Sequence, residues 1–208
     1  MLISQNDFQT LIDQAGDYHD YSLLVRKYLF HGLPFVFEGR EGDYYDFRAA
    51  IANQWNVRFH EVMILGSAKL GYSYYKKTPF TIESDIDVAI VNLELFEQFV
   101  KAVSDIQYKI DNGLIRLTYD QYRRYSKFLE YLVKGWMRPD LLPRNMTGIV
   151  NQGGWFKYFR SISYGNSQVG NYKISAGLFK SFDYMERYYV ESLKASRSNE
   201  TNPVKPEQ

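Results

Sequence analysis

Two short apolar runs interrupt an otherwise helical pattern, and they restrict this chain to folds that contain a small sheet. The run Val62-Met63-Ile64-Leu65 ends at Gly66, which is the pattern of a short buried strand. The segment Asp85–Val91 predicts a second strand. Helical spacing on both sides of these runs indicates an α+β fold, in which a small mixed sheet is flanked by N- and C-terminal helices.

The spacing of apolar residues predicts where the helices lie. In the first 60 residues, helices are expected through Phe8, Leu11, Ile12 and Ala15, through Leu24 to Leu29 with a stop near Gly32, and from about Tyr44 to Asn53. Further along, Asn92 would cap a helix that ends at Asn112-Gly113, and Thr118 with Gln121 forms a capping box for a helix that closes at Lys134-Gly135. A last helix is predicted from the apolar face Ile174, Leu178, Phe182, Met185 and Tyr189.

The chain is expected to form one domain over residues 1–194. Helices would occupy residues 1–58, the core with both motifs residues 59–135, and a basic, aromatic part residues 136–194. Residues 195–208 are polar, contain two prolines and lack an apolar period, so a disordered tail is predicted there.

Composition excludes several kinds of site. The chain has no cysteine, which rules out disulfides, zinc–thiolate sites, iron–sulfur clusters and a cysteine nucleophile, and which fits a cytoplasmic protein. Its three histidines, His19, His31 and His60, lie far apart in the sequence, so any metal should be a hard cation held by carboxylates. No apolar run reaches about 18 residues, and no membrane partner is expected.

Charge is distributed unevenly along the chain, although the formal net charge is only +1. Residues 1–120 carry 11 basic and 17 acidic side chains, whereas residues 121–182 carry 10 basic and 2 acidic ones. Aromatic residues are interleaved with the basic ones from Trp155 to Tyr172. Such a composition suits contacts with phosphates and bases, as in RNA. The alternative is that this half packs against the acidic half.

Two aspartates occupy alternate positions of the second predicted strand. Because side chains alternate along a strand, Asp85 and Asp87 should point to the same face. Two carboxylates held so close repel each other unless a cation lies between them. Since no basic residue separates them, Mg²⁺ or Mn²⁺ is the expected cofactor, with the phosphates of a nucleoside triphosphate as further ligands.

The turn after the first predicted strand supplies three candidate nucleotide-binding residues. Gly66 would let the backbone approach a phosphate closely, and the N–H groups that follow it would point at the anion. Ser67 adds a hydroxyl donor, and Lys69 would add a positive charge. The alternative for Lys69 is a solvated side chain in a flexible loop.

Together, Gly66-Ser67 and Asp85-x-Asp87 resemble the signature of the polymerase-β-like nucleotidyltransferase superfamily, which is a Gly-Ser pair, a helix and a D-x-D strand. The resemblance covers about Val62 to Val91. The block GSAKLGYS…SDIDVAIV also looks like small bacterial nucleotidyltransferase-domain proteins, including ones found among phage-defence or toxin–antitoxin genes. The resemblance implies a sheet of nucleotidyltransferase type, with two metal ions on Asp85 and Asp87 and the β- and γ-phosphates on Gly66 and Ser67.

The superfamily usually has a third carboxylate on a later strand, and this sequence offers no obvious strand-borne one. Asp140 is the first candidate for this third metal-binding and catalytic position, although it can also be explained as a turn residue after Pro139. Asp111 and Asp120 lie at predicted helix ends, where capping explains them better.

The resemblance implies an enzyme that transfers a nucleoside monophosphate from a triphosphate such as ATP to a hydroxyl acceptor, for example RNA or a nucleotide. The alternative is a nucleotide-binding or RNA-binding regulatory module on the same fold, with weakened catalysis because the third carboxylate is missing. A chain of 208 residues has little room for a large acceptor-binding domain, so a protein partner or a homodimer is expected to complete the site.

Overall fold

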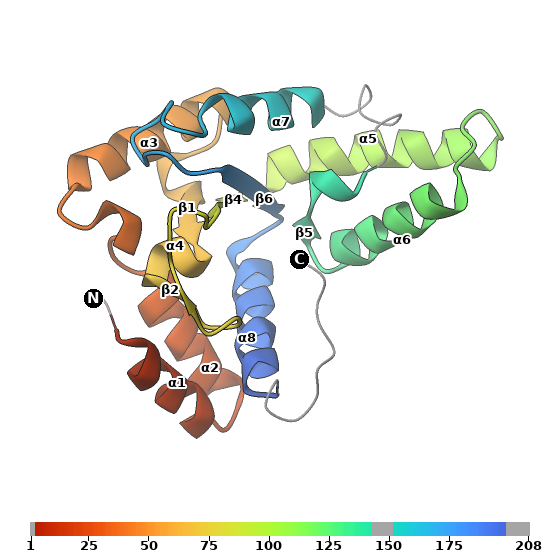
Figure 1. Cartoon of the computed structure of the whole chain (residues 1–208). Helices are drawn as coiled ribbons and strands as arrows, with labels where there is room; N and C mark the ends of the chain where they lie inside the picture. Colours follow the sequence, from red (N-terminus) through yellow and green to blue (C-terminus); the bar gives the residue numbers. More distant parts are fainter. Residues whose placement is uncertain (1–2, 143–151, 199–208) are drawn as a thin grey trace.

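A four-stranded mixed sheet lies at the centre of the molecule (Figure 1), in a computed structural model that describes residues 3–142 and 152–198. The strand order is β1-β4-β6-β5, so the last strand in the sequence, β6, lies inside the sheet. Strand β4 pairs antiparallel with β1 and parallel with β6, and β5 pairs antiparallel with β6. A separate hairpin pairs β2 with β3. The strands are β1 (Val62–Leu65), β2 (Tyr72–Ser73), β3 (Thr78–Pro79), β4 (Ile86–Val91), β5 (Trp136–Met137) and β6 (Ile174–Phe179).

Helices cover both faces of the sheet, so the central strands are buried on both sides. One face packs against α3 (Glu41–Trp55), α5 (Leu93–Asp111), α6 (Tyr119–Val133) and α7 (Gln152–Ser161). The other packs against α1 (Gln5–Gln14), α2 (Tyr18–Leu24), the π-helix η1 (Val25–Phe30) and α8 (Phe182–Ser198). The remaining helical segments are α4 (Gly66–Leu70) and the 3-10 turns η2 (Phe35–Phe37), η3 (Phe59–Glu61) and η4 (Pro139–Leu141).

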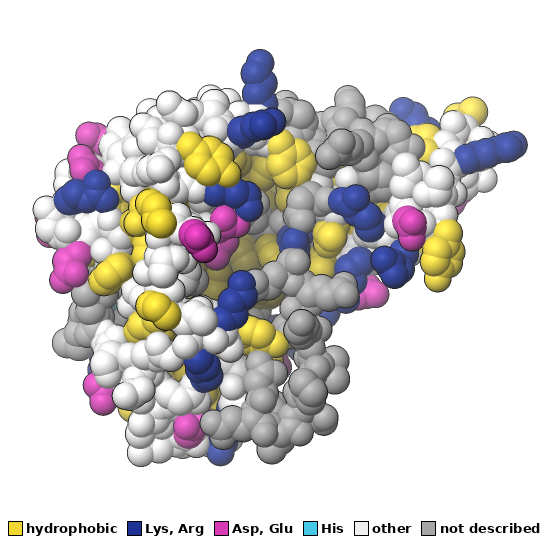
Figure 2. Space-filling model, viewed as in Figure 1, with side chains coloured by type: hydrophobic (Ala, Val, Ile, Leu, Met, Phe, Trp, Pro, Cys, Tyr) yellow, Lys and Arg dark blue, Asp and Glu magenta, His cyan; other side chains and the backbone are white. Residues whose placement is uncertain are grey.

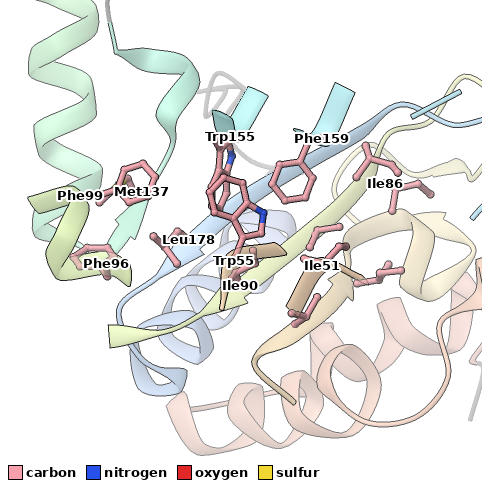
Figure 3. Close-up of a cluster of buried hydrophobic side chains, with 14 of the residues drawn as sticks. Ile51, Trp55, Ile86, Ile90, Phe96, Phe99, Met137, Trp155, Phe159 and Leu178 are labelled. Carbon is pink, nitrogen blue, oxygen red and sulfur yellow. The ribbon is translucent and has the colours of Figure 1, made fainter. Parts of the chain in front are cut away.

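Aromatic packing joins the second half of the chain to the first. Trp155 of α7 lies against Trp55 of α3, with 4.7 Å between the ring centroids, and Phe159 stacks on Trp55 (Figure 3). Phe99 of α5 meets Trp155 edge to face. These rings are almost fully buried, so the aromatic residues predicted to serve nucleic-acid binding contribute here to the core.

Most of the predicted secondary structure is confirmed. The helices α1, α3, α5 and α6, the continuous α2–η1 segment and the strands β1 and β4 occur where the apolar spacing indicated. Asn92 accepts a hydrogen bond from the Leu95 N–H as the predicted cap, and Thr118 and Gln121 form the predicted capping box.

Two predictions about the last part of the chain are wrong. The segment Ile174–Phe179 was expected to begin the last helix, but it forms strand β6, and α8 begins at Phe182. The spacing of Ile174 and Leu178 fits a helix, yet the segment pairs with β4 along its whole length and with β5 at Leu178 and Phe179, so its backbone is satisfied as a strand. Residues 195–198, expected in a disordered tail, continue α8, and residues 199–208 lie outside the described part.

Within the described residues, no helix combines the length and the apolar character needed to cross a membrane.

A matched pair of glycines tests how the α6–β5 connection is packed. Gly113 and Gly135 both follow a helix, with φ of +70° and +69°. A Cβ at Gly135 would clash with the ring of Tyr184, whereas a Cβ at Gly113 meets nothing within 4 Å. We expect Gly113→Ala to lower the free energy of unfolding by about 1 kcal/mol through backbone strain. Gly135→Ala should cost about 1–3 kcal/mol more. Urea unfolding followed by circular dichroism measures both, and equal losses would contradict the packing described.

Candidate functional site

The two predicted aspartates lie where β4 begins, on one face of the sheet. Side chains alternate along β4, so that Ile86, Val88 and Ile90 enter one core and Ala89 and Val91 the other. Asp85 and Asp87 continue the face of Ala89 and Val91, but Asp87 is exposed and the Asp85 side chain is 40% exposed. The carboxylates therefore lie at the point where the helices stop covering this face.

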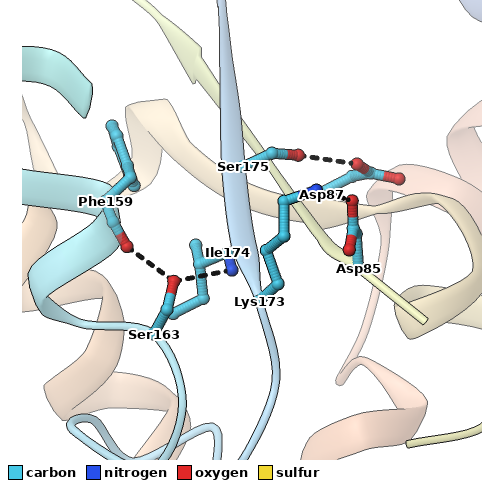
Figure 4. A network of polar contacts seen from close by, with 7 residues as sticks. All are labelled: Asp85, Asp87, Phe159, Ser163, Lys173, Ile174 and Ser175. Carbon is cyan, nitrogen blue, oxygen red and sulfur yellow. Dashed lines mark hydrogen bonds and ion pairs between the residues drawn. The ribbon is translucent and has the colours of Figure 1, made fainter. Parts of the chain in front are cut away.

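Strand β6 and the residue directly before it place a serine and a lysine beside the two aspartates (Figure 4). The parallel register sets Asp87 opposite Ser175, and the Ile86 N–H donates to the Lys173 carbonyl at 2.8 Å. In this register, Lys173 Nζ donates to Asp85 Oδ2 at 2.6 Å, and Ser175 Oγ donates to Asp87 Oδ1 at 3.1 Å. Each carboxylate thus has one partner from the neighbouring strand.

A buried serine fixes the start of β6. Ser163, which follows α7, is 1% exposed. Its Oγ donates to the Phe159 carbonyl at 2.7 Å and accepts from the Ile174 N–H at 2.9 Å. Figure 4 shows this serine between α7 and β6. Since Ile174 lies between Lys173 and Ser175, this contact holds the two site residues of β6 in place.

Gly66 lies directly against Asp87, so the structure brings together the two motifs recognised in the sequence. Leu65, the last residue of β1, is paired with Asp87 of β4, and Gly66 follows with φ of +65°. A Cβ on Gly66 would lie 2.8 Å from Asp87 Oδ2. A glycine is therefore needed here both for the backbone conformation and for the space that the carboxylate occupies. Ser67 follows in α4 and is half-buried.

The surroundings of Asp87 disfavour its charged form. The protein atoms that displace water around the carboxylate, and to a lesser extent the charge of Asp85, raise the pKa of Asp87, whose net value is about 6. The hydrogen bond from Ser175 and the charges of Lys173 and Lys76 act in the opposite direction. The side chain nevertheless reaches solvent. The Asp87 carboxylate is therefore close to protein atoms on one side and in contact with solvent on the other.

The surface view agrees with this geometry. On the face shown in Figure 2, acidic side chains lie beside basic ones near the centre, at the edge of a hollow with hydrophobic side chains deeper inside. Charged groups beside hydrophobic side chains interact with other charges more strongly than they would on an open surface, because less water screens them.

The chemistry of the donor atoms fits a hard divalent cation. Asp85 and Asp87 offer carboxylate oxygens on one face, and the missing side chain of Gly66 allows the Asp87 carboxylate to lie against the turn after β1. Among residues 3–142 and 152–198, no group of three or more metal-binding side chains is present. Two carboxylates would therefore leave most of the coordination sphere to water and to substrate oxygens, which is the usual arrangement for Mg²⁺.

Lys69, predicted to contact phosphate, has a structural role. It is 4% exposed, and its Nζ donates to the carbonyls of His31 and Gly32 at 2.6 Å each. Burial lowers the pKa of Lys69 to about 8. Lys69 thus ties α4 to the end of the π-helix η1. The predicted solvated loop is also absent at this position, because Lys69 belongs to a helix.

Asp140, the candidate third carboxylate, lies in the 3-10 turn η4 after β5. Its side chain lies outside the described residues, so its metal-binding role stays a prediction.

Part of the basic, aromatic half packs inside the molecule, although several of its basic side chains, such as Arg123, Lys157 and Arg160, are exposed. Trp155 and Phe159 are core residues, and Lys173 and Lys180 pair with Asp85 and Glu97 of the more acidic half. For these residues the interpretation that the two halves pack together is confirmed.

Lys173 and Ser175 were not recognised as site residues in the sequence. The sequence after Asn171 gave little sign of a strand, since Ile174 is its one β-branched residue before Lys180 and the spacing of Ile174 and Leu178 is that of a helix.

The comparisons with known proteins add no family: no protein-family model, no curated protein and no solved structure matches this chain.

The raised pKa of Asp87 makes stability depend on pH. Its ordinary value is 3.8 and its value in the fold is about 6, so the fold favours the protonated carboxyl and loses stability as pH rises from about 4 through 6. We expect Asp87→Asn to stabilise the protein at pH 7.5, by about 1 kcal/mol or less because the group reaches water. At pH 4 the stabilisation should vanish.

Urea unfolding at both pH values measures this difference. Asp105→Asn removes one negative charge from the exposed surface of α5 and is the control. If Asp87→Asn changed the free energy of unfolding by the same amount at pH 4 and at pH 7.5, the surroundings of Asp87 would not raise its pKa.

Proposed function

We propose that this chain is a metal-dependent nucleotidyltransferase, which moves a nucleoside monophosphate from a triphosphate to a hydroxyl acceptor and releases pyrophosphate. The observation that carries the proposal is the contact of Gly66 with Asp87, beside Asp85 on the same edge of the sheet. This contact joins the Gly-Ser pair to the D-x-D strand, and the two motifs together form the signature that the sequence resembles. The same resemblance supports a sheet of nucleotidyltransferase type and a role of Ser67 at the phosphates.

The reaction requires little covalent chemistry from the protein. The acceptor oxygen attacks the α-phosphorus, the bond from that phosphorus to the bridging oxygen breaks, and pyrophosphate leaves with its electron pair. The acceptor proton passes to water or to a carboxylate. A divalent ion at Asp85 and Asp87 would offset the charge of the phosphates and orient them. Asp85 and Asp87 would hold that ion, and Gly66 lets the turn that carries Ser67 lie against the Asp87 carboxylate.

A second candidate is a nucleotide-binding module without turnover. One observation favours it. Lys173 and Ser175 contact the aspartates at the place where a third carboxylate would complete a three-acid site. Binding without catalysis needs only the two aspartates and the glycine.

Transfer is tested with each of the four nucleoside triphosphates labelled at the α-phosphate, with Mg²⁺ or Mn²⁺, in the presence and absence of RNA. We expect label to enter an acceptor or the protein itself, and pyrophosphate to be released. Asp87→Asn should lower the rate at least about a hundredfold, because it removes a metal ligand. Asp105→Asn, on α5, should keep the rate within about twofold. Release of pyrophosphate that is insensitive to Asp87→Asn would refute the assignment of the site.

Binding is tested separately from turnover. Triphosphate analogues with a methylene group between the α- and β-phosphorus cannot transfer the nucleotide, so they report occupancy alone. At a hundredfold excess over Kd, such an analogue with Mn²⁺ should raise the free energy of unfolding by about 2.7 kcal/mol. Stabilisation that is lost in Asp87→Asn, with no transfer by the wild type, would identify the second candidate. No stabilisation by any of the four analogues would contradict both.

A further inference from the structure

We propose that Lys173 takes the place of a second metal ion, so that the site binds one divalent cation and uses the lysine as its other positive charge. This inference rests on the proposed function, because it concerns the same site and the same triphosphate.

The position of Lys173 is set by the sheet. Strand β6 is the parallel neighbour of β4, and Lys173 lies two residues before Ser175, which is paired with Asp87. Lys173 therefore shares a face with both aspartates, and its Nζ donates to Asp85 Oδ2 at 2.6 Å (Figure 4). The ammonium group thus already contacts one of the two Asp85 oxygens that a cation could bind.

The exposure of the pair shows that this contact is not a buried structural bridge. The Lys173 and Asp85 side chains are 55% and 40% exposed. An exposed ion pair contributes little to stability. Since a lysine carries three N–H donors, the exposed ammonium group can keep one contact with Asp85 and direct its other donors toward an anion bound next to the two aspartates.

The count of charges supports a single ion. Asp85 and Asp87 bring two negative charges, and Lys173 offsets one of them before any metal binds. Among the described residues no third metal-binding side chain joins the two aspartates. One divalent ion and one lysine then face the triphosphate. In this arrangement Asp87 and Asp85 hold the metal, and Lys173 contacts the phosphates as a point charge.

This arrangement predicts opposite effects of Lys173 on the two ligands. The ammonium group competes with Mn²⁺ for Asp85, so its removal should strengthen the binding of metal alone. The same group attracts phosphate, so its removal should weaken the binding of a triphosphate. A residue that only stabilised the sheet would change both affinities in the same direction.

The test uses the full chain with Mn²⁺ and inorganic triphosphate, which carries the phosphate charges without a base. Electron paramagnetic resonance counts bound Mn²⁺, alone and with triphosphate, and calorimetry at saturating Mn²⁺ measures the triphosphate affinity. The variants are Lys173→Met and the charge-preserving Lys173→Arg. Lys180→Met is the matched control, because Lys180 follows β6 at its other end and pairs with Glu97 at 3.0 Å.

We expect the wild type to bind one Mn²⁺ with triphosphate. Lys173→Met should bind Mn²⁺ alone about fivefold more tightly, and triphosphate about tenfold more weakly. Lys173→Arg should remain within about threefold of the wild type for both ligands, and Lys180→Met should change neither.

Each failure has its own pattern. Two Mn²⁺ ions in the wild type with triphosphate, or a Lys173→Met variant in which both affinities change in the same direction, would overturn the role of Lys173 and leave the proposed function standing. A wild type that binds neither Mn²⁺ nor triphosphate would overturn the proposed function together with the inference. Circular dichroism of each variant verifies that it is folded.

Discussion

The parallel pairing of β4 with β6 is the interaction on which the candidate site depends. It sets Asp87 opposite Ser175 and brings Lys173 to Asp85, so both carboxylates receive a partner from one strand. A shift of this pairing by one residue would turn Lys173 and Ser175 to the opposite face of the sheet. Ser163, which accepts a hydrogen bond from the Ile174 N–H, opposes such a shift because it is anchored in α7 through the Phe159 carbonyl.

On the side of the site formed by the end of β1, the important residue is a glycine, Gly66. Gly66 allows the chain to leave β1 with a positive φ and to pass within contact distance of the Asp87 carboxylate. The helix α4 that begins there is held from behind, because Lys69 donates to two carbonyls at the end of η1. The N-terminal helices therefore act on the site indirectly: they hold the turn that carries Gly66 and Ser67.

The site residues near the first two strands could be predicted from the sequence. The residues that strand pairing brings to them from far along the chain could not. Gly66, Asp85 and Asp87 stood out because they lie at or near the ends of short apolar runs that predict buried strands, and the structure brings Gly66 and Asp87 into contact. Lys173 and Ser175 did not, since Ile174 and Leu178 are spaced as in a helix and only the neighbouring strands decide otherwise. The role of Lys69 was also hidden, because spacing does not reveal that a lysine is buried against backbone carbonyls.

The position of β6 has a consequence for how the protein is made. Asp85 and Lys173 are 88 residues apart, and β6 enters the sheet between β4 and β5, which are both synthesised earlier. Until β6 leaves the ribosome, β4 presents an unpaired apolar edge and the two aspartates lack their partners. The growing chain must therefore keep that edge from aggregating until β6 emerges, and the site forms only after the strand that follows β4 and β5 in the sequence has been synthesised.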